Sequence, residues 1–253
     1  MDLAIKQIVK FHLTGKFGHF RKFYTNSSSL SYLIPPKTAL CGLFASILKI
    51  PRDNYYDLFS NSNVKISCAI SKNAGLKKIT QSVNYLHSKY FNLLIGRSGK
   101  IQHSQCKFEL LSGNRNKSIT YIVYLAILVE KPEFSQLINK MKEGDVGYGI
   151  YFGQRPFKAN ITNVMVYRKN TLKILPQSDK LDSVCNEDNI VNIDFLGSNM
   201  IVQKEKMPCE FKIDNQGREI VRTKNIYFER NGCRITGSFN NVVQLKDKYI
   251  SFY

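Results

Sequence analysis

The stretch SYLIPPKTALCGLFASIL, residues 31–48, predicts an α-helix that follows a rigid segment of chain. Pro35 and Pro36 hold the backbone extended ahead of the helix, where a missing N–H group costs little. We expect the hydroxyl group of Thr38 to cap the first turn. The apolar residues that follow recur at helical spacing and predict one buried face: Leu40, Leu43, Phe44, Ile47 and Leu48.

A second face of this helix carries the small residues Ala39, Gly42, Ala45 and Ser46. Glycine inside a helix costs about 1 kcal/mol relative to alanine, so Gly42 indicates that something approaches the helix closely. One candidate is a sheet that packs tightly against it. The other is a phosphate backbone near the helix N-terminus, where free N–H groups and the helix dipole attract anions.

Length and cysteine usage limit the class of protein. The 253 residues suit one large domain or two small ones, with a core that needs no covalent staples. The cysteines are scattered, with no CxxC pair and no histidine at zinc spacing, so we expect reduced thiols, a cytoplasmic location and no metal. We find no signal peptide, no cofactor motif and no apolar run long enough to cross a membrane.

The net charge of +18 is the strongest global indication of a partner. Up to Phe108 there are 16 Lys and Arg against three acidic residues, a net charge of +13, which leaves +5 for the remainder. Such a field attracts polyanions, and the 14 Tyr and 16 Phe residues offer rings for base stacking. We therefore expect the N-terminal part to bind single-stranded nucleic acid. The alternative is that the charge serves solubility only.

The predicted elements of residues 1–162 follow the order strand, helix, strand, strand, helix, strand. This is the ferredoxin-like layout that RNA-recognition motifs also use, although their short aromatic signature is absent here. Between the second and third strands lies a basic insertion, at about residues 77–118, which we expect to form a β-hairpin thumb. The six elements are residues 5–13, the helix within 31–48, and residues 64–72, 119–129, 132–142 and 148–152.

Residues 163–253 change to a pattern of short strands and turns. Asn231 and Gly232 suit a two-residue hairpin turn. The predicted fold class is therefore α+β, with a ferredoxin-like core that carries a thumb, and a smaller C-terminal β-rich lobe packed against it.

The loop KFGHFRKFY, residues 16–24, alternates cations with aromatic rings. Cations bind phosphates and rings stack on bases, and this combination is typical of grooves for single strands. The alternative is that the phenylalanines anchor the loop to the core while the charges are solvated. The candidate RNA-binding residues of the loop are Lys16, His19, Phe20, Arg21 and Lys22.

Two further basic segments are candidates for RNA contacts. Residues 96–111 lie in the predicted thumb, which would reach across a bound strand unless it is only a solvated loop. Residues 153–159, GQRPFKA, form a tight turn that can also serve backbone geometry alone. The candidates in these two segments are Arg97, Lys100, His103, Lys107, Arg155 and Lys158.

Three segments together resemble the Cascade subunit that caps the 5′ handle of CRISPR RNA, the fifth Cas family of the RAMP superfamily. They are YLIPPKTALCGLFASIL, KFELLSGNRNKSITYIVYLAI and YGIYFGQRPFKANI, and the resemblance spans roughly residues 5–161. It implies a ferredoxin-like core with a thumb that holds the handle of the guide RNA. It also implies contacts with the large subunit and a backbone subunit, and with target DNA only through the complex.

The resemblance also implies roles for residues around the helix start. Pro35, Pro36 and Lys37 would set the helix N-terminus against RNA, Gly42 would permit the close approach, and Tyr32 precedes them. The form PPKTALCGL is most similar to type I-B members, in which a separate ribonuclease usually cuts the repeat. This implies RNA binding without catalysis.

Two alternatives remain open. In type I-C the equivalent subunit cleaves the repeat without a metal, which would give Tyr32 and His103 the proton transfer and Lys100 or Lys107 the charged phosphorane. The sequence departs from that pattern because Gln102, not a lysine, adjoins His103. The other alternative is a structural subunit whose charge complements an acidic protein, and a flat salt response with RNA would favour it.

Overall fold

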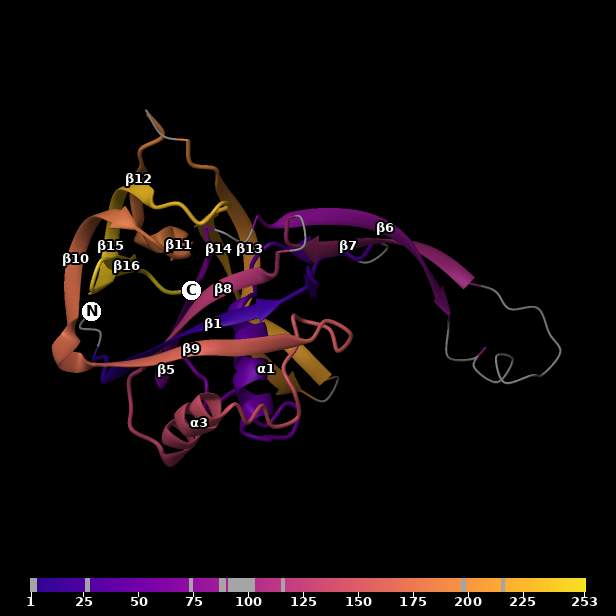
Figure 1. Ribbon diagram of the computed structural model, residues 1–253, viewed down its shortest axis with the longest axis horizontal. Coiled ribbons are helices and arrows are strands. Elements are labelled where there is room, and N and C mark those ends of the chain that lie inside the picture. The colour runs from indigo at the N-terminus through magenta and orange to yellow at the C-terminus, as the bar shows by residue number, and fades with distance from the viewer. Residues whose placement is uncertain are drawn as a thin grey trace.

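The computed structural model describes residues 4–25, 28–72, 75–86, 90, 103–114, 117–196, 199–214 and 217–253. Figure 1 shows a body built of sheets and helices, with one long hairpin that extends away from it. Two of the predicted RNA-binding residues, Arg97 and Lys100, lie outside the described residues.

The central sheet has four antiparallel strands in the order β5-β8-β1-β9. Along the chain these are the second, third, first and fourth core strands, which is the ferredoxin-like arrangement. Helices α1 and α3 lie on one side of this sheet (Figure 1), so the predicted α+β core is confirmed. The bounds are β1 (Gln7–Gly15), α1 (Lys37–Ile47), β5 (Val64–Ile70), β8 (Ile119–Ile127), α3 (Pro132–Glu143) and β9 (Ala159–Arg168).

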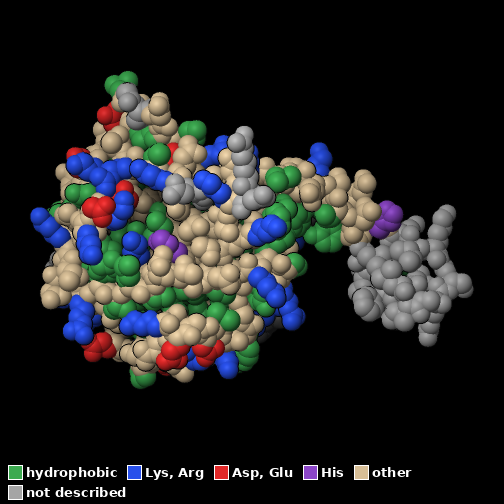
Figure 2. Space-filling view, viewed as in Figure 1, with side chains coloured by type: hydrophobic (Ala, Val, Ile, Leu, Met, Phe, Trp, Pro, Cys, Tyr) green, Lys and Arg blue, Asp and Glu red, His purple; other side chains and the backbone are tan. Residues whose placement is uncertain are grey.

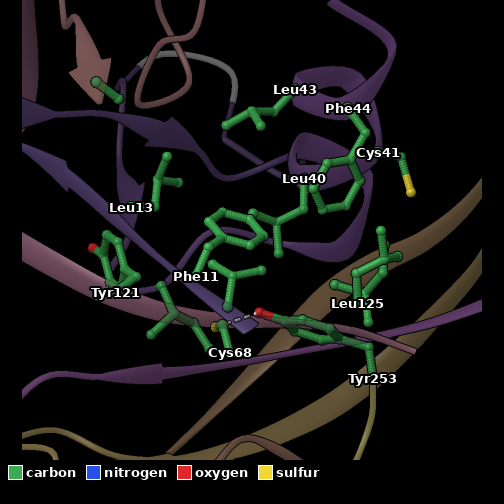
Figure 3. Packing of buried hydrophobic residues seen from close by; sticks show 14 of the residues in the cluster. Phe11, Leu13, Leu40, Cys41, Leu43, Phe44, Cys68, Tyr121, Leu125 and Tyr253 are labelled. Carbon is green, nitrogen blue, oxygen red and sulfur yellow. Dashed lines mark hydrogen bonds between the residues drawn. The ribbon is translucent and has the colours of Figure 1, made fainter. Parts of the chain in front are cut away.

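Alternation along β1 decides which side chains enter the core. Val9, Phe11 and Leu13 are almost completely buried beneath the helices. The ring of Phe11 meets the ring of Phe44 from α1 edge to face, with centroids 6.0 Å apart (Figure 3). Each such side chain contributes about 1.5–3 kcal/mol by leaving water, so this face fixes α1 on the sheet.

Helix α1 begins directly after Pro36, which is its N-cap, and no side chain caps its first turn. The expectation that Thr38 caps the helix is wrong, because Thr38 already lies inside it. A Cβ atom added at Gly42 would lie 3.3 Å from the hydroxyl oxygen of Tyr55. The close neighbour that Gly42 admits is therefore an aromatic side chain and not a sheet.

The fourth core strand is β9, and the expectation of a strand over residues 148–152 is wrong. In that segment the structure has only a single bridge, between Tyr151 and Lys158. Gly147, Gly149 and Gly153 have positive φ angles of 58°, 101° and 81°, so the segment turns repeatedly instead of extending. The alternating apolar residues of this loop resemble a strand in the sequence, although its backbone is not extended.

The thumb is a long antiparallel hairpin of β6 (Lys77–Leu86) and β7 (His103–Ser112), as expected. It projects from the body in Figure 1. At the base of the thumb, β2 (Phe17–Gly18) pairs with β7 and connects the hairpin to the body. Beside it, β3 (Phe20–Arg21) pairs with β4 (Ser31–Tyr32).

The C-terminal lobe is β-rich, as expected, and contains two small sheets with the orders β10-β15-β12 and β11-β14-β13, with β16 paired to β15. Asn231 and Gly232 do not form the predicted hairpin turn, because they connect β14 to β15, which belong to different sheets. The bounds are η2 (Lys169–Thr171), β10 (Leu172–Leu181), β11 (Cys185–Asn186), η3 (Glu187–Asn189), β12 (Ile190–Ile193), β13 (Val202–Asp214), β14 (Gly217–Glu229), β15 (Ile235–Leu245) and β16 (Lys248–Ile250).

The lobe packs directly against the core. Met207 and Phe228 from the β13-β14 hairpin join the same apolar cluster as the residues of β1 and α1. The hydroxyl group of Tyr253 donates to the carbonyl oxygen of Pro35 at 2.5 Å and lies 2.9 Å from the sulfur of Cys68 (Figure 3). The C-terminal segment thereby holds the backbone just ahead of α1.

Candidate nucleic-acid interface

Five segments of the chain border one groove, with a volume of about 390 Å³. They are the loop of residues 16–24, the first turns of α1, the segment after α1 that carries Tyr55, the glycine-rich loop of residues 147–154 and the β13-β14 hairpin. The volume lies toward the lower end of the range of about 300–1,000 Å³ that is typical of ligand pockets. The rings that border it are Phe23, Tyr55, Tyr151 and Phe211, and the guanidinium groups are those of Arg21 and Arg218.

The loop of residues 16–24 supplies the exposed rings of this site. Phe23 is 38% exposed and Tyr24 is 50% exposed, and their rings meet edge to face with centroids 5.1 Å apart. Arg21 is exposed beside them and donates to the carbonyl oxygen of Thr25 at 3.2 Å. Lys16 is also exposed, with its Nζ atom 5.7 Å from the ring centre of Phe17. The loop thus presents rings and cations together, as the sequence predicts.

Direct contacts hold the glycine-rich loop against α1 and against the loop of residues 16–24. The hydroxyl group of Ser46 donates to the carbonyl oxygen of Gly149 at 2.6 Å. A Cβ atom at Gly153 would overlap the carbonyl oxygen of His19, so only glycine allows this contact. Arg155 and Lys158 follow on the exposed side of the turn. Three segments singled out by the sequence therefore meet at one place.

Four of the predicted RNA-binding residues are buried instead: His19, Phe20, Tyr32 and Lys37, at most 4% exposed. The Phe20 ring packs edge to face against Tyr121 and Phe152. The ammonium group of Lys37 donates to Asn61 Oδ1 at 2.6 Å. His19 and Phe20 thus form part of the groove wall, whereas Tyr32 and Lys37 make internal hydrogen bonds away from it.

His19 anchors the thumb to the body. Its Nδ1 atom lies 2.7 Å from the carbonyl oxygen of Glu109, which can only accept, so Nδ1 carries the proton. Its Nε2 atom then accepts from the hydroxyl group of Ser29 at 3.0 Å, and the ring stacks on Phe108 with centroids 4.2 Å apart. Burial lowers the pKa of His19, so the neutral form is favoured.

Lys22 and Tyr32 connect the groove loop to the C-terminal lobe. The ammonium group of Lys22 lies 2.6 Å from a carboxylate oxygen of Glu205, and both side chains are nearly buried. The hydrogen bond and charge of Glu205 raise the pKa of Lys22 against the opposing effect of burial. The hydroxyl group of Tyr32 donates to the carbonyl oxygen of Lys206 at 2.7 Å, and burial raises the pKa of Tyr32.

The thumb presents His103 and Lys107 to solvent. His103 pairs with Leu86 at the outer end of the described hairpin, whereas Phe108 bridges to Ser29 near its base. At about 3.4 Å per residue, His103 lies about 17 Å along β7 from Phe108. The structure therefore does not bring His103 close to Tyr32, whose hydroxyl group is already engaged in the core.

The C-terminal hairpin supplies site residues that the sequence analysis missed. Pro208, Phe211 and Arg218 border the same groove as the loop of residues 16–24. The guanidinium carbon of Arg218 lies 5.3 Å from the ring centre of Phe211. The only sequence signal is an aromatic residue and a basic residue on either side of the turn at Asp214 and Gly217, which does not reveal that the hairpin folds over α1.

Charge and chemistry in the described part of the chain suit binding of an anion. Figure 2 shows blue Lys and Arg side chains spread over the visible face of the body, with few acidic ones among them. Among the described residues, no group of three or more His, Cys, Asp or Glu could hold a metal ion. No helix that the structure describes is long and apolar enough to cross a membrane.

Comparisons with known proteins identify the fold. No family model and no curated protein matches the sequence. A crystal structure of a CRISPR protein from Archaeoglobus fulgidus superposes with a TM-score of 0.55 and 13% identity, over 96% of this chain and 98% of that one. A chain of a CRISPR RNA-guided surveillance complex gives a TM-score of 0.51 and 12% identity, over 88% of this chain and 89% of that one. The chain thus has the fold of these CRISPR proteins over nearly its full length.

Proposed function

We propose that this protein is an RNA-binding subunit of a CRISPR effector complex of the Cascade type, in which it holds the 5′ handle of the guide RNA. The observation that carries the proposal is the groove itself. Exposed Phe23 and Arg21 border it together with the start of α1, Arg218 and the turn at Gly153 and Gln154, which the exposed Arg155 and Lys158 follow in the chain. Rings for bases beside cations for phosphates are the combination that binds single strands.

The shape of the molecule supports a path for the strand. The groove lies beside the base of the thumb, where β2 pairs with β7, and Lys107 is exposed on β7. A strand that leaves the groove meets this hairpin next. The fold likeness to a chain of an RNA-guided surveillance complex supports membership of such a complex. On this proposal, the large subunit and a backbone subunit are its protein partners, and target DNA is reached through them.

The proposed role is binding without cleavage. Cleavage by the type I-C route would need Tyr32 and His103 at one phosphate, and the structure keeps the Tyr32 hydroxyl group in the core. Burial raises the pKa of Tyr32, which makes the phenolate a costly species to form.

The test begins with the RNA that the protein carries. A tagged chain is expressed with a CRISPR array and its partner subunits, and the copurified RNA is sequenced. We expect repeat-derived 5′ ends to be enriched and protected from nuclease. RNA without enrichment of the repeat, or none at all, would overturn the proposal.

Salt dependence then tests the groove. With a single-stranded RNA of the enriched sequence, Arg21→Ala should weaken binding and reduce the slope of log K against log salt by about 0.7, because one phosphate contact is lost. Lys173→Ala is the matched control, since Lys173 is an exposed cation on β10 of the C-terminal lobe. Equal effects of the two substitutions would show that only the net charge matters.

A further inference from the structure

The β13-β14 hairpin places an aromatic ring and a guanidinium group side by side at the groove. In the ladder, Phe211 is paired with Ile220 and Ile213 with Arg218. Because cross-strand partners and alternate residues share a face, Phe211 and Arg218 project from the same side of the hairpin. Both border the groove, and the guanidinium carbon lies 5.3 Å from the ring centre.

The guanidinium group of Arg218 is held in one orientation. Its Nε atom donates to Asp53 Oδ1 at 3.1 Å, and its Nη2 atom donates to the same oxygen. The guanidinium carbon also lies 5.9 Å from the ring centre of Tyr56. The hydroxyl group of Tyr56 donates to Asp53, and this bond together with Arg218 lowers the pKa of Asp53. The carboxylate thus stays ionised and keeps Arg218 in place.

This arrangement remains accessible. The side chain of Arg218 is 32% exposed, and Phe211 is half-buried. Phe23, which is 38% exposed, and Arg21 border the same groove. An immobilised guanidinium plane next to a ring is one of the surfaces on which unpaired bases stack, and immobilisation in advance reduces the entropy lost on binding.

We infer that Phe211 and Arg218 form a stacking platform for one unpaired nucleobase of the bound RNA. The inference rests on the proposed function, and it assigns to the C-terminal lobe a direct part in RNA binding. The platform recognises the face of a base, so it is tolerant of base identity. Arg21, which borders the same groove, then supplies a cation for a phosphate of the same strand.

The experiment separates the ring from the charge. Binding of a fluorescein-labelled 12-nucleotide single-stranded RNA to the full chain is measured by anisotropy at several salt concentrations. Phe211→Leu should weaken binding about 5- to 100-fold with an unchanged salt slope, because stacking is lost and no charge changes. Phe211→Tyr retains the ring and should bind within about twofold of the parent chain.

Two arginine variants complete the design. Arg218→Lys keeps the positive charge but removes the planar guanidinium group. It should therefore weaken RNA binding while the slope of log K against log salt stays unchanged. Arg222→Ala is the control, because Arg222 is exposed on the same strand but does not border the groove. It should leave the affinity within about twofold at constant melting temperature. Arg218→Lys also serves as the second probe if Phe211→Leu fails to fold.

A base analogue locates the platform on the strand. In RNAs that carry 2-aminopurine at one position at a time, stacking should quench a single position, and Phe211→Leu should relieve that quenching. If Phe211→Leu and Arg218→Lys bind as the parent does while Arg21→Ala weakens binding, the platform is refuted and the proposed function stands. If the parent chain and its complex bind no repeat RNA, the proposed function itself fails.

Discussion

The two long hairpins of this protein are attached to the body in different ways. The thumb, β6-β7, buries Phe108 and Leu111 near its base, while Ile79 on the other strand near the base and Tyr85 toward the outer end are 41% and 49% exposed. The β13-β14 hairpin instead buries a row of apolar side chains against α1 and β5: Met207, Cys209, Ile226 and Phe228. Burial of apolar side chains therefore fixes the β13-β14 hairpin to the body, whereas the thumb is attached mainly through the residues at its base.

The comparison shows that the same kind of element, a β-hairpin, can either project from the body or be packed against it. A two-stranded hairpin alone is marginally stable in water, and the outer thumb is held mainly by its own strand pairing. The β13-β14 hairpin is stabilised by apolar burial in the part that contains Met207, Cys209, Ile226 and Phe228, and this part supports the groove residues nearer its turn. We expect the groove to be preformed and the thumb to be stabilised when it binds.

The largest expected effect comes from the apolar attachment of β13-β14. Phe228 is 2% exposed within the main core cluster, so Phe228→Ala should lower the free energy of unfolding by about 3–5 kcal/mol. The matched thumb variant, Ile79→Ala, should lower it by less than about 1 kcal/mol because Ile79 is exposed. Urea unfolding followed by circular dichroism measures both, and equal losses would remove the distinction between the hairpins.

A second prediction concerns the ion pair that links the groove loop to β13. Lys22→Ala leaves the carboxylate of Glu205, which is 13% exposed, without its partner, and should destabilise the protein by about 1–3 kcal/mol. Arg21→Ala removes an exposed cation that has no carboxylate partner among the described contacts, and should change stability by less than about 0.5 kcal/mol.

Double substitution checks the cause of that effect. Lys22→Met with Glu205→Leu removes both charges together, so most of the lost stability should return. Thermal unfolding of the single and double variants gives the coupling free energy between the side chains of Lys22 and Glu205. A double variant that is no better than Lys22→Ala would mean that the two side chains act independently.

A third prediction uses the polar anchor of the thumb. The pKa of His19 is lowered by burial, so the unfolded state takes up a proton before the folded state does. The contribution of His19 to stability is present above the ordinary pKa of 6.5 and is lost as pH falls below it. Between pH 7.5 and pH 5.5, amide exchange in β7, corrected for its intrinsic rate, should rise, while exchange in β13-β14 stays constant.

His19→Gln should remove this pH dependence of the thumb, because no proton is taken up at that position. His12 is the matched control, since burial and the charge of Lys10 also lower its pKa but it lies outside the thumb contacts. His12→Gln should leave exchange in β7 as pH-dependent as in the parent chain. Loss of the dependence in both variants would argue against His19 as the thumb anchor.

The smallest expected effect is on cleavage. Because the structure separates His103 from Tyr32, repeat RNA incubated with the complex in EDTA should remain intact on a denaturing gel, with and without His103→Ala. A single cut that His103→Ala abolishes would establish a metal-independent ribonuclease. The thumb would then carry a catalytic residue and would not serve binding alone.

The core could be predicted because its signals are local. The helical spacing of Leu40, Leu43 and Phe44 and the apolar run of β8 require no knowledge of distant residues. The loop of residues 148–152 was misassigned because its apolar alternation resembles a strand, whereas positive φ angles at the neighbouring glycines prevent one. The turn at Asn231 was misassigned because a turn motif does not specify which sheet receives the next strand.

The candidate site also contains features that local sequence signals predict and features that only the packing of distant elements decides. Sequence alone determined the charge, the ring-and-cation loop of residues 16–24, the thumb, and the first three strands and both helices of the core, since these depend on composition and short-range periodicity. The tertiary structure decided that Arg21 faces outward while His19 turns inward, and that Phe211 and Arg218 cross α1 to complete the groove. The physical reason is that such contacts depend on how whole elements pack, and a side chain's burial is set by that packing and not by its neighbours in the chain.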